Sequence, residues 1–447
     1  MARNEPADSP FTENTRKGTT DVRVAGRYAI TMGSKGVVTD PLIEIEGHRI
    51  KSIDSKPGSD ADIRVDGIIL PGLISTHTHL HGLVAYGHPI PPPAGFWPFL
   101  KEWWWPLVED VLTAEDVESL AAYAALLHLK SGYTCFCDVM EAPYAAAGFM
   151  MREAQAIAAT GARALVSNEA TERAGSEIAE KLLDENAAIL YLKGRVQGLM
   201  SVHTTFSCSG DYIRKAKDIA REKSALFQLH LSEGTYHVQD TQERFGKRPV
   251  PYLDDLGVLD EMTIASQSVH LEEEEIAILA ERKVSVSHNP ISNMEIGTGA
   301  APVAQMLKSG VNVTLGDDGF VRAFDPFVNM STTFLLHALT TGGGDVGAQD
   351  VLSFLTTNAA RALRLEAGAI EEGNLADLVL LEDSSPAPLI PENTIYHTVL
   401  GAASGDVRAV IVDGQVVIDG GVAQLVDEER LKSTAMHTIR RLWTGSA

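Results

Sequence analysis

Two kinds of hydrophobic pattern divide the chain. Near both ends, short segments of apolar and polar residues are separated by glycines, a pattern typical of hairpins in a small antiparallel sheet. Such strands are predicted at 22–24, 27–32, 42–45, 49–53 and 64–65, and again at 378–382, 407–412 and 416–418. Neither group is large enough to form a domain alone. We therefore expect the two ends to meet in one small β domain.

Between these groups, short apolar segments alternate with segments of helical periodicity. Eight strands are predicted, at 68–79, 134–138, 162–168, 198–205, 225–232, 263–270, 284–288 and 311–316. Helical patterns separate most of them, as at 115–130, 145–160, 212–223 and 273–280. Eight β/α repeats fit a (β/α)8 TIM barrel. A doubly wound open sheet is the alternative, but it predicts a glycine-rich phosphate loop after the first strand, where this chain has a histidine-rich segment.

The predicted organisation is therefore an α/β protein with a (β/α)8 barrel and a small flanking β-sandwich built from both termini. Residues 1–67 are assigned to the N-terminal part of the sandwich and 68–364 to the barrel. Residues 365–447 are assigned to the C-terminal part of the sandwich and a terminal helix at 427–443. A further helix is expected at 348–363, directly after the barrel.

Composition excludes several classes of protein. The chain is 45% hydrophobic and 22% charged, with a formal net charge of −23. This is the balance of an ordinary soluble globular protein, and its acidity argues against nucleic acid and anionic membrane surfaces as partners. No apolar stretch is long enough for a transmembrane helix, and the first twenty residues are polar, unlike a secretory signal. Three cysteines cannot form a disulfide framework, so we expect a reducing, cytoplasmic compartment.

Histidines and carboxylates recur where the predicted barrel strands end. His77 and His79 end the first strand, and a period of two places both imidazoles on one side of it. His230 ends the fifth strand, and Asp318 follows the eighth. The C-terminal face of a barrel is where catalytic groups collect. Their shared position at strand ends indicates one site.

These residue types suit metal-dependent hydrolysis. Three histidines and one aspartate around a metal ion, with water in an open position, form a known hydrolytic arrangement. The metal lowers the pKa of that water towards about 7 and makes hydroxide available at neutral pH. Glu233 lies just beyond His230 and is free to act on the substrate.

At these motifs the chain resembles the amidohydrolase superfamily, and within it the cytosine-deaminase-like branch of adenosylhomocysteine deaminases, guanine deaminases and triazine hydrolases. The resemblance extends over about residues 20–420. It rests on the ordered segments PGLISTHTHLHG (71–82), HLSEG (230–234), RPVPYLDDLGVL (248–259), SHNPISN (287–293), GAAPVAQMLKSGVNVTLGDDG (299–319) and GAIEEGNLADLVLLE (368–382).

The resemblance implies a barrel flanked by a small β-sandwich. It also implies that His77, His79, His230 and Asp318 bind one divalent metal ion, zinc or iron. Glu233 matches the family's proton-shuttling glutamate, and His203, at the end of the fourth strand, matches a histidine that contacts the substrate. The family further suggests a homodimer or a larger homo-oligomer.

One position departs from the family pattern. The sixth strand of the family ends in Ala-His-Cys-Val-His, whose first histidine is catalytic, and this chain has Gln267 there. His270 matches the second, non-catalytic histidine. A glutamine amide orients a water molecule but does not accept its proton, so proton transfer would fall to Asp318 and Glu233. The departure predicts an altered or relaxed hydrolysis, recruitment of His270, or weakened catalysis.

The loop after the first strand contains four of the five tryptophans, at 97 and 103–105. Two interpretations remain open. The loop packs as a helix against the barrel, or it forms an aromatic lid over a flat, apolar ligand, with Trp97 and Tyr86 contacting the substrate. His288, which ends the seventh strand, is a candidate for contact with the substrate or support of the metal site.

The sequence therefore predicts a metal-dependent hydrolase that attacks an electrophilic carbon of a small cyclic or aromatic nitrogen compound and releases ammonia or an amine. Hydrolysis of a urea, carbamate, N-acyl or halogenated-ring substrate is the alternative within enzymes. A non-catalytic relative that binds metal and ligand is the alternative from another class, and Gln267 is its only support.

Overall fold

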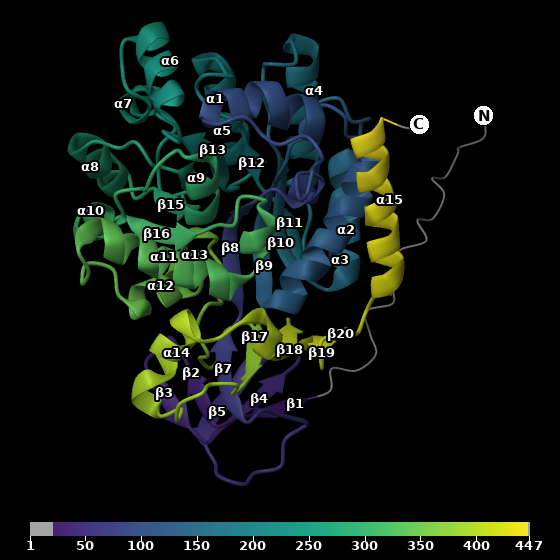
Figure 1. The fold of residues 1–447 in the computed structure, drawn as a ribbon, viewed down its shortest axis with the longest axis vertical. Helices are drawn as coiled ribbons and strands as arrows, with labels where there is room; N and C mark the ends of the chain where they lie inside the picture. The colour runs from purple at the N-terminus through teal and green to yellow at the C-terminus, as the bar shows by residue number, and fades with distance from the viewer. Residues whose placement is uncertain (1–20, 446–447) are drawn as a thin grey trace.

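The structure is a computed structural model that describes residues 21–445, and Figure 1 shows their arrangement. Two parallel sheets occupy its centre. The first has the strand order β11-β10-β9-β8 and the second β12-β13-β14-β15-β16. Their strands are β8 Leu73–Thr78, β9 Tyr133–Met140, β10 Arg163–Asn168, β11 Val196–Gly198, β12 Met200–Ser201, β13 Phe227–Leu231, β14 Thr263–Gln267, β15 Ser285–His288 and β16 Asn312–Leu315.

The two parallel sheets are linked at both margins, by the chain itself on one side and by hydrogen bonds on the other. On one side the chain passes directly from β11, which pairs with β10, into β12, which pairs with β13. On the other side the backbone N–H of Asp317, just after β16, donates to the carbonyl oxygen of His77 in β8 at 2.9 Å. The hydroxyl oxygens of Thr76 and Thr314 lie 2.7 Å apart at the same margin. These links bring the ends of β8 and β16 together, which determines the position of the site.

Strands from both chain ends pair in one sheet, as the sequence predicts. Its order is β20-β19-β18-β17-β7-β2-β3, and β17 pairs with β7 from Leu378 opposite Pro71 to Glu382 opposite Gly67. A second sheet, β5-β4-β1-β6, shares a buried apolar cluster with it. The strands are β1 Val22–Ala25, β2 Tyr28–Ile30, β3 Val37–Thr39, β4 Pro41–Glu46, β5 Arg49–Ser55, β6 Ile63–Arg64, β7 Gly67–Pro71, β17 Leu378–Glu382, β18 Val407–Val412, β19 Gln415–Asp419 and β20 Val422–Ala423.

Helices surround the parallel sheets in Figure 1, and the terminal sheets lie at one end. The α-helices are α1 Phe96–Pro98, α2 Ala114–Ser131, α3 Phe149–Thr160, α4 Ser176–Ile189, α5 Gly210–Glu222, α6 Thr235–Phe245, α7 Pro249–Asp255, α8 Glu273–Glu281, α9 Pro290–Ile296, α10 Val303–Lys308, α11 Pro326–Thr341, α12 Ala348–Phe354, α13 Thr357–Ala362, α14 Thr394–Leu400 and α15 Glu428–Thr444. η2 Phe99–Glu109 is a π-helix. The 3-10 helices are η1 Leu80–Val84, η3 Val321–Phe324, η4 Pro391–Asn393 and η5 Ser404–Asp406.

The C-terminal helix α15, yellow in Figure 1, lies along α2. Arg441 of α15 pairs with Asp116 of α2, and the hydroxyl oxygens of Thr438 and Ser119 lie 3.0 Å apart between the same helices. From residue 21 to residue 445, every helix is too short or too polar to cross a bilayer. The polar segment 1–20, predicted not to be a secretory signal, lies outside the described residues.

Two predicted elements are divided in the structure. The strand expected at 68–79 is β7, in the terminal sheet, followed by β8, in the parallel sheet. Gly72 separates them, because a Cβ atom there would lie 2.1 Å from the hydroxyl oxygen of Thr134. The helix expected at 348–363 is α12 and α13, since Thr356 leaves the helical conformation with φ −127° and ψ −102°. Sequence periodicity continues across both breaks and therefore does not reveal them.

Candidate active site

Four side chains converge where three parallel strands end. His77 and His79 lie at the end of β8, His230 in β13 and Asp318 just after β16, and each is at least 94% buried. The Oδ1 atom of Asp318 lies 2.8 Å from His77 Nε2 and 3.6 Å from His79 Nε2. The Nε2 atoms of His77 and His230 are 3.1 Å apart. We call these four residues the metal cluster.

Each imidazole of the metal cluster has a polar partner at Nδ1, opposite the atom that faces the centre. His79 Nδ1 lies 2.6 Å from the carbonyl oxygen of Val139, and His77 Nδ1 lies 3.2 Å from the amide oxygen of Gln228. Both partners are hydrogen-bond acceptors, so both rings carry a proton on Nδ1 and direct Nε2 inward. His230 Nδ1 lies 2.6 Å from the carboxylate of Glu169.

This donor set fits a divalent metal ion. Its ligand atoms lie within 4.8 Å of one another, and ligands bound tetrahedrally at about 2.0–2.2 Å from zinc lie about 3.3 Å apart. Burial lowers the pKa of His79, but Glu141 and Asp318 outweigh burial and raise it to about 10. Burial raises the pKa of Asp318, and its contacts with His77 and His79 lower that pKa overall. The site thus attracts positive charge.

The two adjacent aspartates have different surroundings. Asp318 adopts a positive φ of 57°, which turns its side chain away from that of Asp317. Of the two aspartates, Asp318 is the one whose carboxylate joins the metal cluster. Asp317 accepts hydrogen bonds from the hydroxyls of Ser75 and Thr78 and lies 3.1 Å from His128 Nε2. Asp317 therefore fixes the base of the site.

Gln267, which the sequence analysis predicts to replace a catalytic histidine, lies beside the metal cluster. Its amide nitrogen donates to Asp318 Oδ1 at 2.9 Å, and its amide oxygen accepts from Asn293 Nδ2 at 2.7 Å. It is 1% exposed and has a positive φ of 78°. Both functions of the amide are used, so Gln267 holds one oxygen of Asp318 in a fixed direction.

Glu233 lies in the turn between β13 and α6, and it is 7% exposed. Burial is the largest cause of its raised pKa, and the nearby charge of Asp318 adds to it. In the part of the chain that the structure describes, no hydrogen bond or ion pair holds its carboxyl group. A protonated carboxyl group without a protein partner is able to donate its proton to a ligand.

Three buried glutamates border the metal cluster, and the sequence analysis missed them. Glu141 follows β9, Glu169 follows β10, and Glu109 ends η2. Glu141 accepts a hydrogen bond from Trp104 Nε1 at 2.7 Å, and Glu109 pairs with Arg173. Glu141 and Glu169 follow parallel strands directly, as the predicted ligands do, so their position was the available signal.

Aromatic rings form a wall beside the metal cluster. Trp97 stacks on Tyr236, with ring centroids 3.9 Å apart, and meets Trp105 edge to face. Trp105 and Phe206 in turn contact His203, at centroid distances of 6.0 and 5.1 Å. Burial lowers the pKa of His203 to about 3, so this ring is neutral. Trp97 and His203 thus belong to one wall of the site.

The structure gives the surroundings of three other candidates. Tyr86 is 69% exposed. His288 Nε2 lies 3.1 Å from His337 Nε2, so its ring faces α11. His270 is half-buried, and its carbonyl oxygen accepts from Arg248. Their predicted roles remain predictions.

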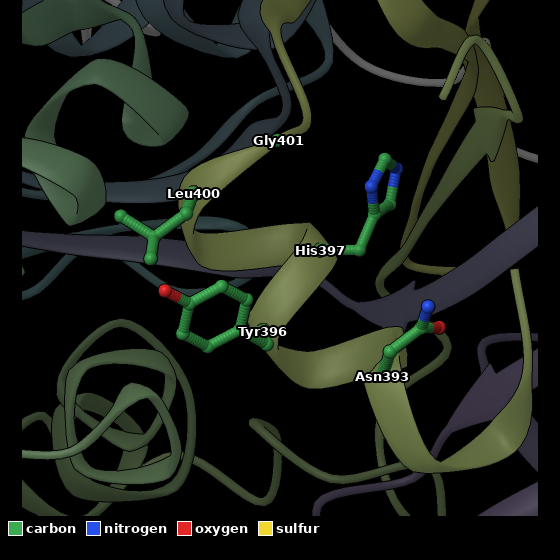
Figure 2. A pocket seen from close by; sticks show the side chains of 5 residues that line it. All are labelled: Asn393, Tyr396, His397, Leu400 and Gly401. Atoms are coloured by element: carbon green, nitrogen blue, oxygen red, sulfur yellow. The ribbon is translucent and has the colours of Figure 1, made fainter. Parts of the chain in front are cut away.

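A surface pocket of about 210 Å³ lies over α14, far along the chain from the metal cluster. Figure 2 shows its lining residues, Asn393, Tyr396, His397, Leu400 and Gly401. They offer one imidazole and no carboxylate. The pocket therefore lacks the donor set of a hydrolytic metal site.

Comparisons with known proteins identify relatives of this chain. The model of the amidohydrolase family matches residues 68–417. The 5'-deoxyadenosine deaminase of Methanosarcina mazei is 33% identical over 434 residues, which cover 94% of this chain and 98% of that protein. The 5-methylthioadenosine/S-adenosylhomocysteine deaminase of Caldanaerobacter subterraneus is 32% identical over 419 residues, or 90% of this chain and 94% of that protein.

Solved structures share the fold. A zinc-bound adenosine deaminase from Xanthomonas campestris superposes with a TM-score of 0.84 at 23% identity, covering 95% of this chain and 99% of that one. Atrazine chlorohydrolase from Arthrobacter aurescens, with zinc, gives a TM-score of 0.80 at 19% identity, covering 93% and 100%. The predicted family and reaction class are confirmed. The chain belongs to the amidohydrolase family and is a metal-dependent hydrolase of carbon–nitrogen bonds other than peptide bonds.

Proposed function

We propose that the protein deaminates an adenosine derivative. Water adds to the purine carbon that carries the exocyclic amino group, that carbon–nitrogen bond breaks, and ammonia leaves an oxo-purine nucleoside. The observation that carries the proposal is the convergence of three inward Nε2 atoms and one carboxylate beside the partnerless Glu233. Relatives that match over 90% or more of this chain and are named as adenosine-derivative deaminases support the same substrate class.

We further propose that the parallel strands form a (β/α)8 barrel and that the terminal sheets form a flanking sandwich. The hydrogen bond from Asp317 to His77 at one margin supports closure, and the apolar cluster shared by the terminal sheets supports the sandwich. The proposed divisions are 1–67, 68–364 and 365–447. A barrel would place the metal cluster at its C-terminal face, where such enzymes act.

His77, His79, His230 and Asp318 would hold one divalent ion, zinc or iron. When bound, such an ion supplies a water of lowered pKa as the nucleophile and polarises the reacting centre. Imidazole nitrogen with one carboxylate suits either metal. We propose one ion for each subunit of a cytoplasmic homo-oligomer.

The proton transfers are assigned to two carboxyl groups. Asp318 Oδ1, between two imidazoles, accepts a proton from the attacking water. Glu233 donates its proton to a ring nitrogen of the substrate and then takes the next one to the leaving amine. Gln267 holds Asp318 by its 2.9 Å hydrogen bond and accepts no proton. With the proton transfers assigned to Asp318 and Glu233, the reaction needs no histidine at position 267.

His203 and Trp97 are proposed to contact the substrate base. A neutral His203 is able to donate or accept a hydrogen bond at a heterocycle, and an indole face suits a flat ring. The contacts of Tyr86 and His288 with the substrate and the recruitment of His270 in catalysis stay predictions.

Hydrolysis of a urea, carbamate or halogenated ring is the second candidate. Gln267 favours it, because relatives with the usual chemistry have a proton-accepting histidine there. The same metal cluster and Glu233 would serve both reactions.

The test is ammonia release from 5'-deoxyadenosine, 5'-methylthioadenosine and S-adenosylhomocysteine by zinc-loaded protein, with aryl ureas and chlorinated triazines alongside. We expect turnover of at least one nucleoside. Turnover confined to the ureas or triazines would replace the proposal with the second candidate. A protein that binds zinc and turns over no compound would be a non-catalytic relative.

A further inference from the structure

We propose that Glu169 is a positioning residue for the metal cluster: it accepts the Nδ1 proton of His230 and so directs His230 Nε2 at the metal. The inference rests on the metal cluster of the proposed function. It concerns a residue for which neither the sequence motifs nor the family resemblance suggested a role. It would give one metal ligand an ionisable partner.

The contact between the two residues is close and fully enclosed. Glu169 Oε1 lies 2.6 Å from His230 Nδ1, and the side chains are 3% and 7% exposed. In residues 21–445, neither His230 Nδ1 nor Glu169 Oε1 has an aligned hydrogen-bond partner, so their 2.6 Å approach is a close polar contact between two otherwise unpaired atoms. A buried imidazole N–H without an acceptor is costly, so Glu169 is the acceptor that the site provides.

The contact at Nδ1 matters because Nε2, on the opposite side of the His230 ring, faces the metal cluster. His230 Nε2 lies 3.1 Å from His77 Nε2, inside the metal cluster. A proton on Nδ1 leaves the Nε2 lone pair free for the metal, whereas a proton on Nε2 would block it. Carboxylate–histidine–metal arrangements fix ring orientation and raise ligand basicity in this way.

The three ligand histidines differ in the partner of Nδ1. His79 faces a backbone carbonyl and His77 faces an amide, which are both neutral groups. His230 Nδ1 lies 2.6 Å from the carboxylate of Glu169, whereas the carboxylate of Glu141 lies 4.0 Å from His79 Nδ1. Removal of Glu169 therefore changes both the direction and the charge at one ligand, while the other two ligands keep their partners.

The backbone holds Glu169 in position for this role. Its N–H donates to the carbonyl oxygen of Met140 at 2.8 Å, and the next residue, Ala170, forms a bridge with Val202. Glu169 Oε2 lies 3.8 Å from His203 Nε2. The carboxylate thus lies between the fourth and fifth strands, with its nearer oxygen on His230.

The experiment measures zinc affinity of the full-length, metal-stripped protein by competition with a chromophoric chelator. Glu169→Ala should weaken zinc binding roughly 10- to 100-fold. Glu169→Gln should weaken it less, by roughly three- to tenfold, because an amide oxygen still accepts a hydrogen bond from Nδ1 but lacks the charge. Glu153→Gln is the matched control, since Glu153 is a fully buried carboxyl group on α3 and should bind zinc as the wild type does.

Three results would overturn the proposal. One is wild-type zinc affinity in Glu169→Ala or, if that variant does not fold, in Glu169→Gln. Another is an equal loss in Glu153→Gln, which would indicate a general effect of removing a buried carboxyl group. The third is a change in KM for nucleosides with zinc affinity unchanged, which would make Glu169 a substrate contact. The variant His230→Ala distinguishes a failure of this proposal from a failure of the proposed metal cluster. Wild-type zinc affinity in His230→Ala would refute the metal cluster itself.

Discussion

Several non-glycine residues around the active site adopt an uncommon backbone conformation. Ser232, Gln267, Ser268 and Asp318 have φ values between 47° and 78°. Such conformations cost free energy for residues other than glycine and persist where the surrounding structure enforces them. They turn the chain sharply at the strand ends, so that neighbouring side chains such as Asp317 and Asp318 separate.

Gln267→Ala should lower kcat/KM roughly 10- to 100-fold, because Asp318 loses a hydrogen bond to its charged oxygen. Steady-state deamination rates would measure this. Asn293→Ala is the matched variant: it keeps the bond from Gln267 to Asp318 and frees only the amide oxygen, so its loss should be smaller. Wild-type kcat/KM in Gln267→Ala would show that the amide does not direct Asp318.

Glu153 predicts how stability depends on pH. Burial raises its pKa well above its ordinary value of 4.5, and Asp138 adds to the rise. A raised folded-state pKa contributes stability that is complete below the unfolded pKa and is lost as the pH rises through the folded pKa. Glu153→Gln should therefore gain stability relative to wild type from pH 5 to pH 8. The measurement is the thermal unfolding midpoint of both proteins across that range. A difference between the two midpoints that stayed constant with pH would contradict the prediction.

At the scale of elements, loop one packs some of its tryptophans inward and places others in the aromatic wall, and the aromatic lid over a ligand stays a prediction. Residues 99–109 form a π-helix, with Pro106 inside it, and the N–H of Asp110 donates to Trp105 O, five residues back. Proline removes one donor from a helix, and π-helical turns are frequent at functional sites. Trp103 and Trp104 pack inward, while Trp97 and Trp105 join the aromatic wall.

The C-terminal helix α15 packs against the start of loop one, at Val84 and His88. Trp443 Nε1 donates to the carbonyl oxygen of Val84 at 2.8 Å, and its ring meets His88 edge to face. Trp443→Ala should lower the unfolding midpoint by roughly 2–4 °C. Differential scanning fluorimetry would measure this, with the exposed His437→Ala as the control. Equal midpoints for both variants and the wild type would mean that α15 does not stabilise the loop.

For the whole molecule, sequence periodicity predicted most of the arrangement. Alternating strands and helices indicated the parallel sheets, and the matching β segments indicated that the chain ends share a sheet. The breaks at Gly72 and Thr356 were not predictable, because a close approach to Thr134 and a single pair of dihedral angles cause them. Both depend on the folded structure.

The sequence predicted the centre of the active site better than the residues around it. The metal cluster follows from histidine and aspartate at strand ends, in motifs that the family shares. Two features around the metal cluster were not predictable, because they depend on side-chain directions across neighbouring strands. They are the hydrogen bond from Gln267 to Asp318 and the positions of the Glu141 and Glu169 carboxyl groups. His288 also ends a strand, and its Nε2 atom lies 3.1 Å from His337 Nε2; its predicted role stays a prediction.

The central claim is that metal-dependent hydrolysis at this site depends on Glu233 as the proton donor. The most direct measurement is ammonia release from 5'-deoxyadenosine by wild type and Glu233→Gln, with the zinc content of both proteins determined on the same samples. We predict turnover by the wild type and a loss of about 10²- to 10⁴-fold in kcat in the variant, at equal zinc content. Undiminished turnover in zinc-loaded Glu233→Gln would contradict the account.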